Sequence, residues 1–284
     1  MTNYLEVTNL SKSFDFFQLH NISFTLPKGY IMGLIGANGS GKTTTIKLIL
    51  NMLKRTGGTV KVMGLDNIAE EQKVKSELGV VFDTNYFSDD WKVSQVEKSI
   101  SVFYPNWDSQ KFADMLRKFH IAPTKKVKEL SKGMQMKLML ACAFSYDAKL
   151  LILDEPTSGL DPVSRDELLD TFRTLCEQEG VSILFSTHIT SDLDACADTI
   201  TYIQHGRVAA STDKKAWTGG YLLLQGSDAA CTPALRAACI GARSHKGELE
   251  ALLRKEDAAL AAGFALTPAN LEQIMVHLER EAEA

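Results

Sequence analysis

The chain has few cysteines, and none of them belongs to a metal or disulfide motif. Its 284 residues include five cysteines, an odd number, and no two form a C-x-x-C pair. This argues against a disulfide framework and against a cysteine-based zinc site. A basic excess is also missing, because 31 Lys and Arg residues face 35 Asp and Glu residues, for a net charge of −4. We therefore expect no nucleic-acid partner, since such a partner usually requires a basic surface.

Long hydrophobic runs are absent as well. No stretch reaches about 18 consecutive apolar residues, so the sequence predicts no membrane span. Residues 1–6 carry an acid and no long apolar core, which is not the pattern of a signal peptide. We expect a cytoplasmic protein in a reducing compartment, which would need a partner to associate with a membrane.

The sequence does contain a phosphate-binding loop. Residues 36–43 read G-x-x-x-x-G-K-T, the P-loop or Walker A pattern, between an apolar run and a helix-like run. Its glycines let backbone N–H groups approach phosphate oxygens, and the following helix directs the positive end of its dipole there. Lys42 can reach the β- and γ-phosphates, and the Thr43 hydroxyl can ligate Mg²⁺. The predicted nucleotide-binding residues of the loop are Gly36, Ala37, Asn38, Gly39, Ser40, Gly41, Lys42, Thr43 and Thr44.

A pair of carboxylates follows a second apolar strand. Residues 150–153 are all apolar, and Asp154 and Glu155 come directly after them. Asp154 is placed to hold Mg²⁺, and Glu155 to position or deprotonate a water molecule. His188 follows the next predicted strand and could contact the γ-phosphate. Alone, such groups are usually polar strand ends or structural histidines, so their assignment as site residues depends on the P-loop.

Alternating strands and helices predict an α/β protein with a parallel sheet. Strands at 5–7 and 22–26 alternate polar and apolar residues and predict an N-terminal antiparallel subdomain. An aromatic-rich stretch with helical periodicity predicts an inserted helical subdomain at about 84–145. A shift in composition separates a first domain, 1–211, from a small C-terminal appendage, 212–284. In the appendage we expect a strand at 222–224 and helices at 249–262 and 270–283.

Two further motifs lie in a fixed order with these. Residues 130–134 read Leu-Ser-Lys-Gly-Met, and residues 158–161 read Ser-Gly-Leu-Asp. Over about residues 4–210 the complete set resembles the ATP-binding subunits of ABC transporters. In that family the motifs are the Walker A loop, the signature, the Walker B strand, the D-loop and the switch histidine. The Lys and Met of the signature, and residues 103–108, resemble the branch of bacterial drug and peptide-antibiotic exporters.

The resemblance implies ATP and Mg²⁺ as cofactors and a head-to-tail dimer. Each ATP would lie between one subunit's P-loop and the other's signature, so Ser131 and Gly133 would serve the partner's nucleotide. Phe14 occupies the position of the aromatic that stacks on adenine, although residues 14–17 could instead fill a hairpin core. Asp83 stands where the family usually has glutamine, and it would hold Mg²⁺ less directly.

Two functions compete. In the first, the chain hydrolyses ATP to drive a separate membrane permease, on the inner face of the cell membrane, with an identical or closely related ATPase as partner. The resemblance favours export. The alternative is a soluble ABC-type ATPase acting on ribosomes or DNA. Ribosome factors of this kind usually carry two cassettes, whereas this chain has one P-loop; DNA-repair types insert long coiled coils, whereas only about 45 residues separate Asp83 from the signature. A P-loop kinase or GTPase would lack the signature and the D-loop.

Overall fold

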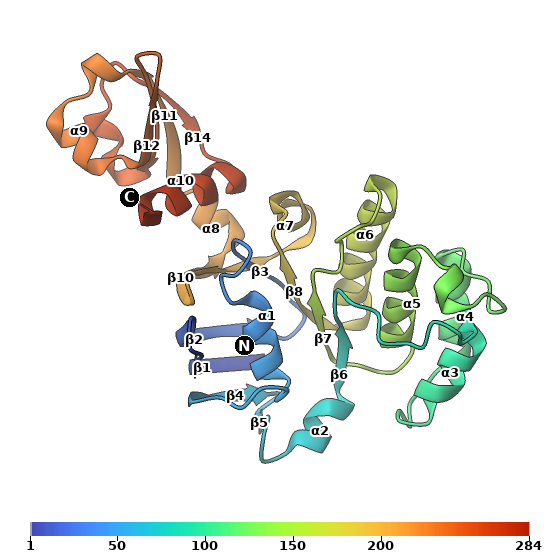
Figure 1. The fold of residues 1–284 in the computed structure, drawn as a ribbon. Helices are drawn as coiled ribbons and strands as arrows, with labels where there is room; N and C mark the ends of the chain where they lie inside the picture. The colour runs from blue at the N-terminus through green and yellow to red at the C-terminus, as the bar shows by residue number, and fades with distance from the viewer. Residues whose placement is uncertain (1, 284) are drawn as a thin grey trace. The chain divides into compact units, whose positions relative to one another are not determined.

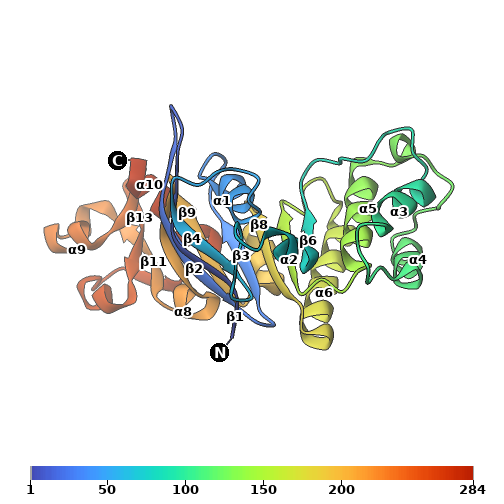
Figure 2. The same ribbon diagram turned by 90° about the horizontal axis from the view of Figure 1, so that it is seen from below.

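The computed structural model describes residues 2–283. Contacts divide the chain into two compact units, Met1–Ser211 and Thr212–Ala284. The first unit holds every motif named above, and its architecture is drawn in Figures 1 and 2. The two units are described separately.

The centre of the first unit is a six-stranded sheet. Its strands, in the order in which they lie side by side, are β10 (Arg207–Asp213), β9 (Thr199–Gln204), β3 (Ile31–Ile35), β8 (Ser182–Thr187), β7 (Leu150–Asp154) and β6 (Leu78–Val81). Strands β9, β3, β8, β7 and β6 run parallel. Every residue of β3, β7 and β8 is buried, which explains why these strands have continuous apolar sequences.

Parallel strands place their carboxyl ends at one edge of a sheet. The P-loop follows β3, the Asp154–Glu155 pair ends β7, and His188 follows β8. Since β8 lies between β3 and β7, the sheet order brings these three segments together. The helices α6 (Pro162–Glu179) and α7 (Thr190–Cys196) pack on this sheet, and α1 (Lys42–Ile49) packs against β7.

A second, antiparallel sheet covers part of the first unit. Its order is β2 (Gln18–Pro27), β1 (Asn3–Ser13), β4 (Gly57–Val62) and β5 (Leu65–Asp66). Along β2 buried and exposed residues alternate, as expected for strands with one face on a core. Residues of both sheets, including Leu26 and Leu184, share one hydrophobic cluster, so the two sheets pack against each other.

The inserted helical subdomain is confirmed. Its helices are α3 (Val93–Ser101), α4 (Ser109–Lys118) and α5 (Lys132–Phe144), with a short 3₁₀ turn at Val127–Glu129. They lie together beyond the β6 edge of the sheet in both views (Figures 1 and 2). Before β6, the short helix α2 (Glu71–Ser76) belongs to the core. Tyr104 stacks on Tyr146 with ring centroids 3.7 Å apart, which anchors the α3–α4 connection to the end of α5.

The second unit is a small antiparallel sheet with helices. The sheet order is β12 (Ile240–His245), β13 (Glu248–Arg254), β11 (Tyr221–Ser227) and β14 (Ala265–Pro268). The unit also contains α8 (Lys214–Thr218), α9 (Pro233–Ala238), α10 (Leu271–Glu283) and two 3₁₀ turns, Asp228–Ala230 and Lys255–Leu260. The predicted strand at 222–224 and the closing helix at 270–283 are confirmed by β11 and α10.

The prediction of a helix at 249–262 is wrong. Residues up to Arg254 form β13, and only Lys255–Leu260 turn into a 3₁₀ helix. Strand β13 pairs along its length with β11, from Tyr221 opposite Arg254 to Ser227 opposite Glu248. Pairing with a strand distant in sequence therefore overrides the helical preference of a leucine- and alanine-rich segment.

Candidate functional site

The P-loop turns tightly between β3 and α1, and two of its glycines are required by geometry. Gly41 has φ 116°, a conformation that other residues rarely adopt. A Cβ on Gly36 would lie 2.2 Å from the carbonyl oxygen of Ile203, so no side chain fits there. These two positions shape the backbone that faces the cavity.

Lys42 lies inside the loop rather than in solvent. Its side chain is 6% exposed, and its Nζ donates to the carbonyl oxygens of Gly36 at 2.8 Å and Ala37 at 3.3 Å. Glu155 Oε1 lies 3.6 Å from the same Nζ. The ammonium group therefore sits at the centre of the loop, where a phosphate would meet it.

Asp154 and Thr43 are in direct contact. The Thr43 hydroxyl donates to Asp154 Oδ1 at 3.2 Å, and the hydroxyl of Ser186 donates to the same oxygen at 2.6 Å. Asp154 is almost completely buried. A hydroxyl beside a carboxylate is a pair of hard oxygen ligands, the kind that Mg²⁺ prefers.

Glu155 and His188 form a second close pair. Nδ1 of His188 lies 2.9 Å from Glu155 Oε2, and the backbone N–H of Glu155 donates to Ser186 Oγ at 2.9 Å. Glu155 itself has φ 50°, a left-handed conformation that costs a residue other than glycine about 1–2 kcal/mol. The fold thus holds this carboxylate at the site in an unfavourable backbone conformation, which is a feature found often at functional positions.

Lys42, Thr43, Glu155 and His188 line one cavity of about 390 Å³, whereas the buried Asp154 does not line it. Its lining residues are Phe17, Asn38, Gly39, Gly41, Lys42, Thr43, Thr44, Asp83, Glu155, Ser158 and His188. The lining brings together segments that follow β3, β6, β7 and β8. Asp83 is exposed in this cavity, and it accepts a hydrogen bond from the Thr84 hydroxyl at 3.1 Å.

The remaining predicted P-loop residues lie around this cavity without lining it. Gly36 is buried at the end of β3, and the carbonyl of Ala37 accepts from Lys42. The Ser40 hydroxyl is buried. They shape the loop from behind.

Of the aromatic segment 14–17, only Phe17 packs against the hydrophobic cluster of the two sheets, and Phe14 and Phe16 do not fill a hairpin core. Phe14 is 44% exposed and Phe16 is fully exposed, because a turn closed by a 2.8 Å bond from Phe14 N–H to the Phe17 carbonyl projects both rings outward. Phe17 lines the cavity, whereas Phe14 does not. The ring centroids of Phe14 and Phe17 are 6.3 Å apart.

Sequence reasoning missed Phe17. Its ring lies 3.1 Å from where a Cβ on Gly41 would stand, so it packs against the end of the P-loop, just before α1. The contact forms because the start of β2 lies next to the P-loop in the folded protein. No local sequence motif indicates it.

The signature residues lie outside this cavity. Ser131 caps α5 by accepting from Met134 N–H at 3.3 Å. Ser131 is exposed and Gly133 is partly exposed. A Cβ on Gly133 would stand 3.2 Å from Leu160 and 3.5 Å from the carbonyl of Gly159, so the start of α5 lies against the D-loop.

The D-loop ends in a helix cap. Asp161 accepts from the N–H groups of Val163 and Ser164 at the start of α6. Hydrogen bonds from Ser164, from its hydroxyl and then its N–H, lower the pKa of the Asp161 carboxyl. The negative charge also suits the positive end of the α6 dipole. This cap fixes where the D-loop stops and the helix begins.

Within residues 2–283, no helix is both long enough and apolar enough to cross a bilayer. The same part of the chain has no group of three or more His, Cys, Asp or Glu side chains arranged around a metal position. A site for a metal would therefore depend on a mixed set such as Thr43 and Asp154.

Comparisons with known proteins show which family the chain resembles. Residues 19–158 match the family model described as ABC transporter. The chain is 31% identical over 222 residues to the ABC transporter ATP-binding protein YtrB of Bacillus subtilis, covering 78% of this chain and 76% of that protein. It is 31% identical over 217 residues to the daunorubicin/doxorubicin resistance ATP-binding protein DrrA of Streptomyces peucetius, covering 74% of this chain and 65% of the relative.

A solved structure shares the fold. It is a dimeric post-hydrolysis state of the ATP-binding cassette MJ0796 bound to ADP and Pi, with TM-score 0.67 and 21% identity, covering 74% of this chain and 98% of that one. The chain therefore belongs to the ATP-binding proteins of ABC transporters, which hydrolyse ATP.

Proposed function

We propose that this chain hydrolyses ATP at the cavity beside the P-loop and so drives a separate membrane permease that exports its substrate. The observation that carries the proposal is the contact of Glu155 with His188, 2.9 Å apart, at the same strand edge as Lys42. This places a carboxylate able to accept a proton from water next to the group that would hold the γ-phosphate.

The site residues have separate roles in this proposal, and one of them, Asp154, is buried and does not itself line the cavity. P-loop N–H groups and Lys42 bind the phosphates, Glu155 accepts the proton of the attacking water, and His188 contacts the γ-phosphate. Thr43 and Asp154 would hold Mg²⁺, with Asp83 reaching it through water; their mutual contact at 3.2 Å fits such a donor set. The bound ion would neutralise phosphate charge. Phe14 remains our proposal for adenine stacking, and Phe17 is a second candidate because it lines the cavity.

A dimer around two ATP molecules belongs to the same proposal. Ser131 and Gly133 lie at the exposed start of α5 and outside their own cavity, which suits a role at the partner's nucleotide. Helix N-termini bind anions through free N–H groups and the dipole. The dimeric state of the structural relative supports this arrangement.

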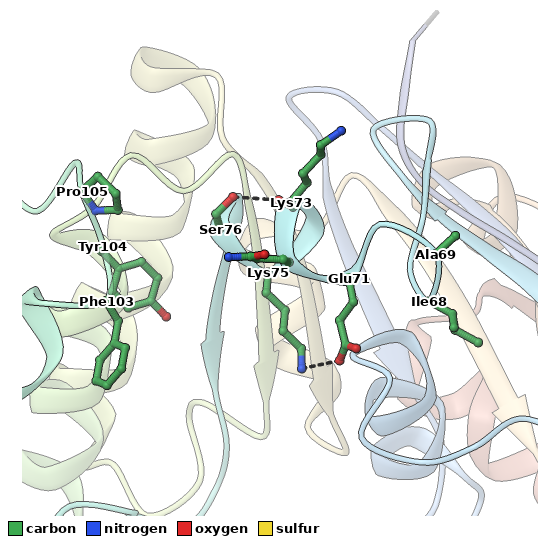
Figure 3. Close-up of a pocket in the computed structure, with 10 residues that line it drawn as sticks. Ile68, Ala69, Glu71, Lys73, Lys75, Ser76, Phe103, Tyr104 and Pro105 are labelled. Carbon is green, nitrogen blue, oxygen red and sulfur yellow. Dashed lines mark hydrogen bonds and ion pairs between the residues drawn. The ribbon is translucent and has the colours of Figure 1, made fainter.

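We place the permease at a groove beside the helical subdomain. The groove has a volume of about 1070 Å³. In Figure 3 the side chains of Phe103, Tyr104 and Pro105 form one wall, and Ile68, Ala69 and residues of α2 form the other. Phe103 is 77% exposed, and Tyr86, in the segment after Asp83, is 67% exposed. Exposed aromatic side chains of this kind are enriched in interfaces.

Asp90 is exposed in the segment after Asp83, but it does not line the groove and is a poor target for charge reversal. Its carboxylate pairs with Lys128 at 2.8 Å and Lys126 at 3.6 Å, and the hydrogen bond from Lys128 lowers the pKa of Asp90. Reversing its charge would disturb the helical subdomain itself. Phe103, which lines the groove, is a better target, and so is Tyr86, which lies outside the groove and packs edge-on against Phe82 but is still largely exposed.

The function is tested by co-purification from detergent-solubilised membranes. We expect the tagged chain to bring down a multi-span membrane protein, and the variants Tyr86→Glu and Phe103→Glu to lose at least half of it while retaining ATP binding. Phe16→Glu, a fully exposed phenylalanine elsewhere, is the matched control and should retain the partner. Such capture would also support a location on the inner face of the cell membrane.

If the chain captures no multi-span protein and sediments with ribosomes, the transport proposal fails. If the permease is captured equally by all variants, the groove is wrong but the transport function stands. The direction of transport needs a second measurement. For an exporter, the accumulation of a labelled drug in cells should fall when the complex is expressed and rise when its genes are deleted. The name of the DrrA relative, a drug-resistance protein, supports export as the direction.

A further inference from the structure

A buried carboxylate behind the site joins three loops. Asp192 lies on α7 and is 0% exposed. Its Oδ2 accepts from the hydroxyl of Thr157 at 2.7 Å and from that of Thr187 at 3.1 Å. Its Oδ1 accepts from Nε of Arg165. Asp192 does not line the cavity, so it acts on the reaction only through its neighbours.

Each donor belongs to a segment that carries a site residue. Thr157 comes two residues after Glu155, and Thr187 comes immediately before His188. The Thr187 hydroxyl also accepts from the N–H of Ile189 at 3.0 Å, which fixes the backbone on both sides of His188. The carboxylate of Asp192 is therefore bonded to the segments behind both members of the Glu155–His188 pair.

The third donor extends the connection to the D-loop helix. Arg165 lies in the first turn of α6, after the Asp161 cap, and its second nitrogen donates to Ser191 Oγ at 2.7 Å. Arg165 thus spans α6 and the start of α7. One carboxylate holds the Walker B segment, the switch histidine segment and the D-loop helix in fixed positions.

The burial of this charge makes the arrangement rigid. A buried carboxylate is tolerated only when charged partners and hydrogen bonds compensate its lost hydration. Bonds that involve ionised groups are about twice as strong as neutral ones. Since two hydroxyls and a guanidinium compensate Asp192, moving any one of the three segments would leave a buried polar group unpaired.

We propose that Asp192 is a positioning residue for ATP hydrolysis, which holds Glu155 and His188 at their mutual distance. The inference rests on the role of Glu155 and His188 in hydrolysis and is independent of the permease. Displacement of a reacting group by about 1 Å can cost a factor of about 100 in rate. The P-loop, on β3 and α1, makes no bond to Asp192, so nucleotide affinity should not depend on it.

The test compares Asp192→Asn with Asp194→Asn in the full chain. Asp194 lies on the same helix and is exposed, so it is the matched control. We expect Asp192→Asn to lower kcat at least about tenfold while the dissociation constant for ATP changes less than about threefold. The control should retain both values. A folded Asp192→Asn protein with kcat within threefold of wild type, or with kcat and affinity falling together, overturns the proposal.

A second comparison decides the matter if Asp192→Asn does not fold. Thr157→Val keeps the shape of the side chain and removes its bond to Asp192, whereas Thr157→Ser keeps the hydroxyl. The serine variant should turn over ATP at least several times faster than the valine variant, at equal ATP affinity. Equal kcat values for the two variants overturn the proposal. Glu155→Gln is measured alongside, because full turnover in that variant would instead mean that the site itself is wrongly assigned.

Discussion

Glu155 is the residue at which the groups of the site converge. Its two carboxylate oxygens face different partners, Lys42 at 3.6 Å and His188 at 2.9 Å. Glutamine has the same size and can keep one hydrogen bond, but it carries no charge and cannot accept a proton from water. Substitution by glutamine therefore separates chemistry from binding.

We expect Glu155→Gln to bind ATP with nearly unchanged affinity and to lose at least about 100-fold in turnover, the usual contribution of a general base. Steady-state phosphate release measures turnover, and a nucleotide titration measures affinity. Glu177→Gln, at an exposed position on α6, is the control. Turnover within a few-fold of wild type would remove Glu155 from the role of base.

For single residues, the sequence predicts those whose position is determined by a local motif. The spacing of residues 36–43 predicts the P-loop because one short segment makes its whole geometry. Asp192 could not be found in this way. Two aspartates lie two residues apart on α7 with no motif to distinguish them, and only the tertiary fold buries Asp192 and exposes Asp194.

Among the elements, α5 links the signature to the D-loop. Ser131 caps its first turn, and a Cβ at Gly133 would stand 3.2 Å from the Leu160 side chain, which would have to shift by a few tenths of an ångström. The exposed N-terminus of this helix is the surface that we propose for the partner's nucleotide.

Ser131→Arg should leave each subunit folded and able to bind ATP, because the residue is exposed and the lost cap costs only about 1 kcal/mol. The bulky side chain should block the ATP-dependent dimer. Light scattering in a Glu155→Gln background, with and without ATP, measures this. Ser109→Arg, at the exposed start of α4, is the control. An ATP-dependent dimer that persists in the Ser131→Arg variant contradicts a role across subunits.

The elements themselves were predictable where burial dominates. Strand β7 has four apolar residues before Asp154. A continuous apolar run of this kind is typical of a parallel strand that is buried on both faces, so the sequence predicts the strand directly. Strand β13 was not predictable from its own residues, because Leu249, Ala251 and Leu253 favour a helix in isolation. These residues are buried in a cluster with Leu224 of β11 and Leu235 of α9, and β13 pairs with β11, about 25 residues earlier in the chain.

In the whole molecule, the chemistry that we propose lies in one unit. Every predicted site residue belongs to Met1–Ser211, and the other unit has its own hydrophobic cluster. Strand β10 continues to Asp213, two residues past the boundary between the units. A truncation that respects the fold therefore ends after Asp213.

We expect the chain truncated after Asp213 to fold and to hydrolyse ATP at a rate within a few-fold of the full chain. Circular dichroism and a thermal melt establish folding, and phosphate release measures activity. We propose that the C-terminal unit then serves regulation or dimer stability. A truncated protein that is folded but inactive would show that the second unit takes part in the chemistry.

The left-handed backbone of Glu155 has a consequence for engineering. Glycine at residue 155 would relieve the strain of the left-handed backbone conformation. A thermostabilisation strategy that ranks positions by backbone preference would therefore select Glu155→Gly among its first substitutions. That replacement would remove the carboxylate that we propose as the base. A thermostabilised variant of this protein should therefore keep Glu155 and carry its stabilising substitutions at other positions. Natural enzymes often trade stability for activity at such positions.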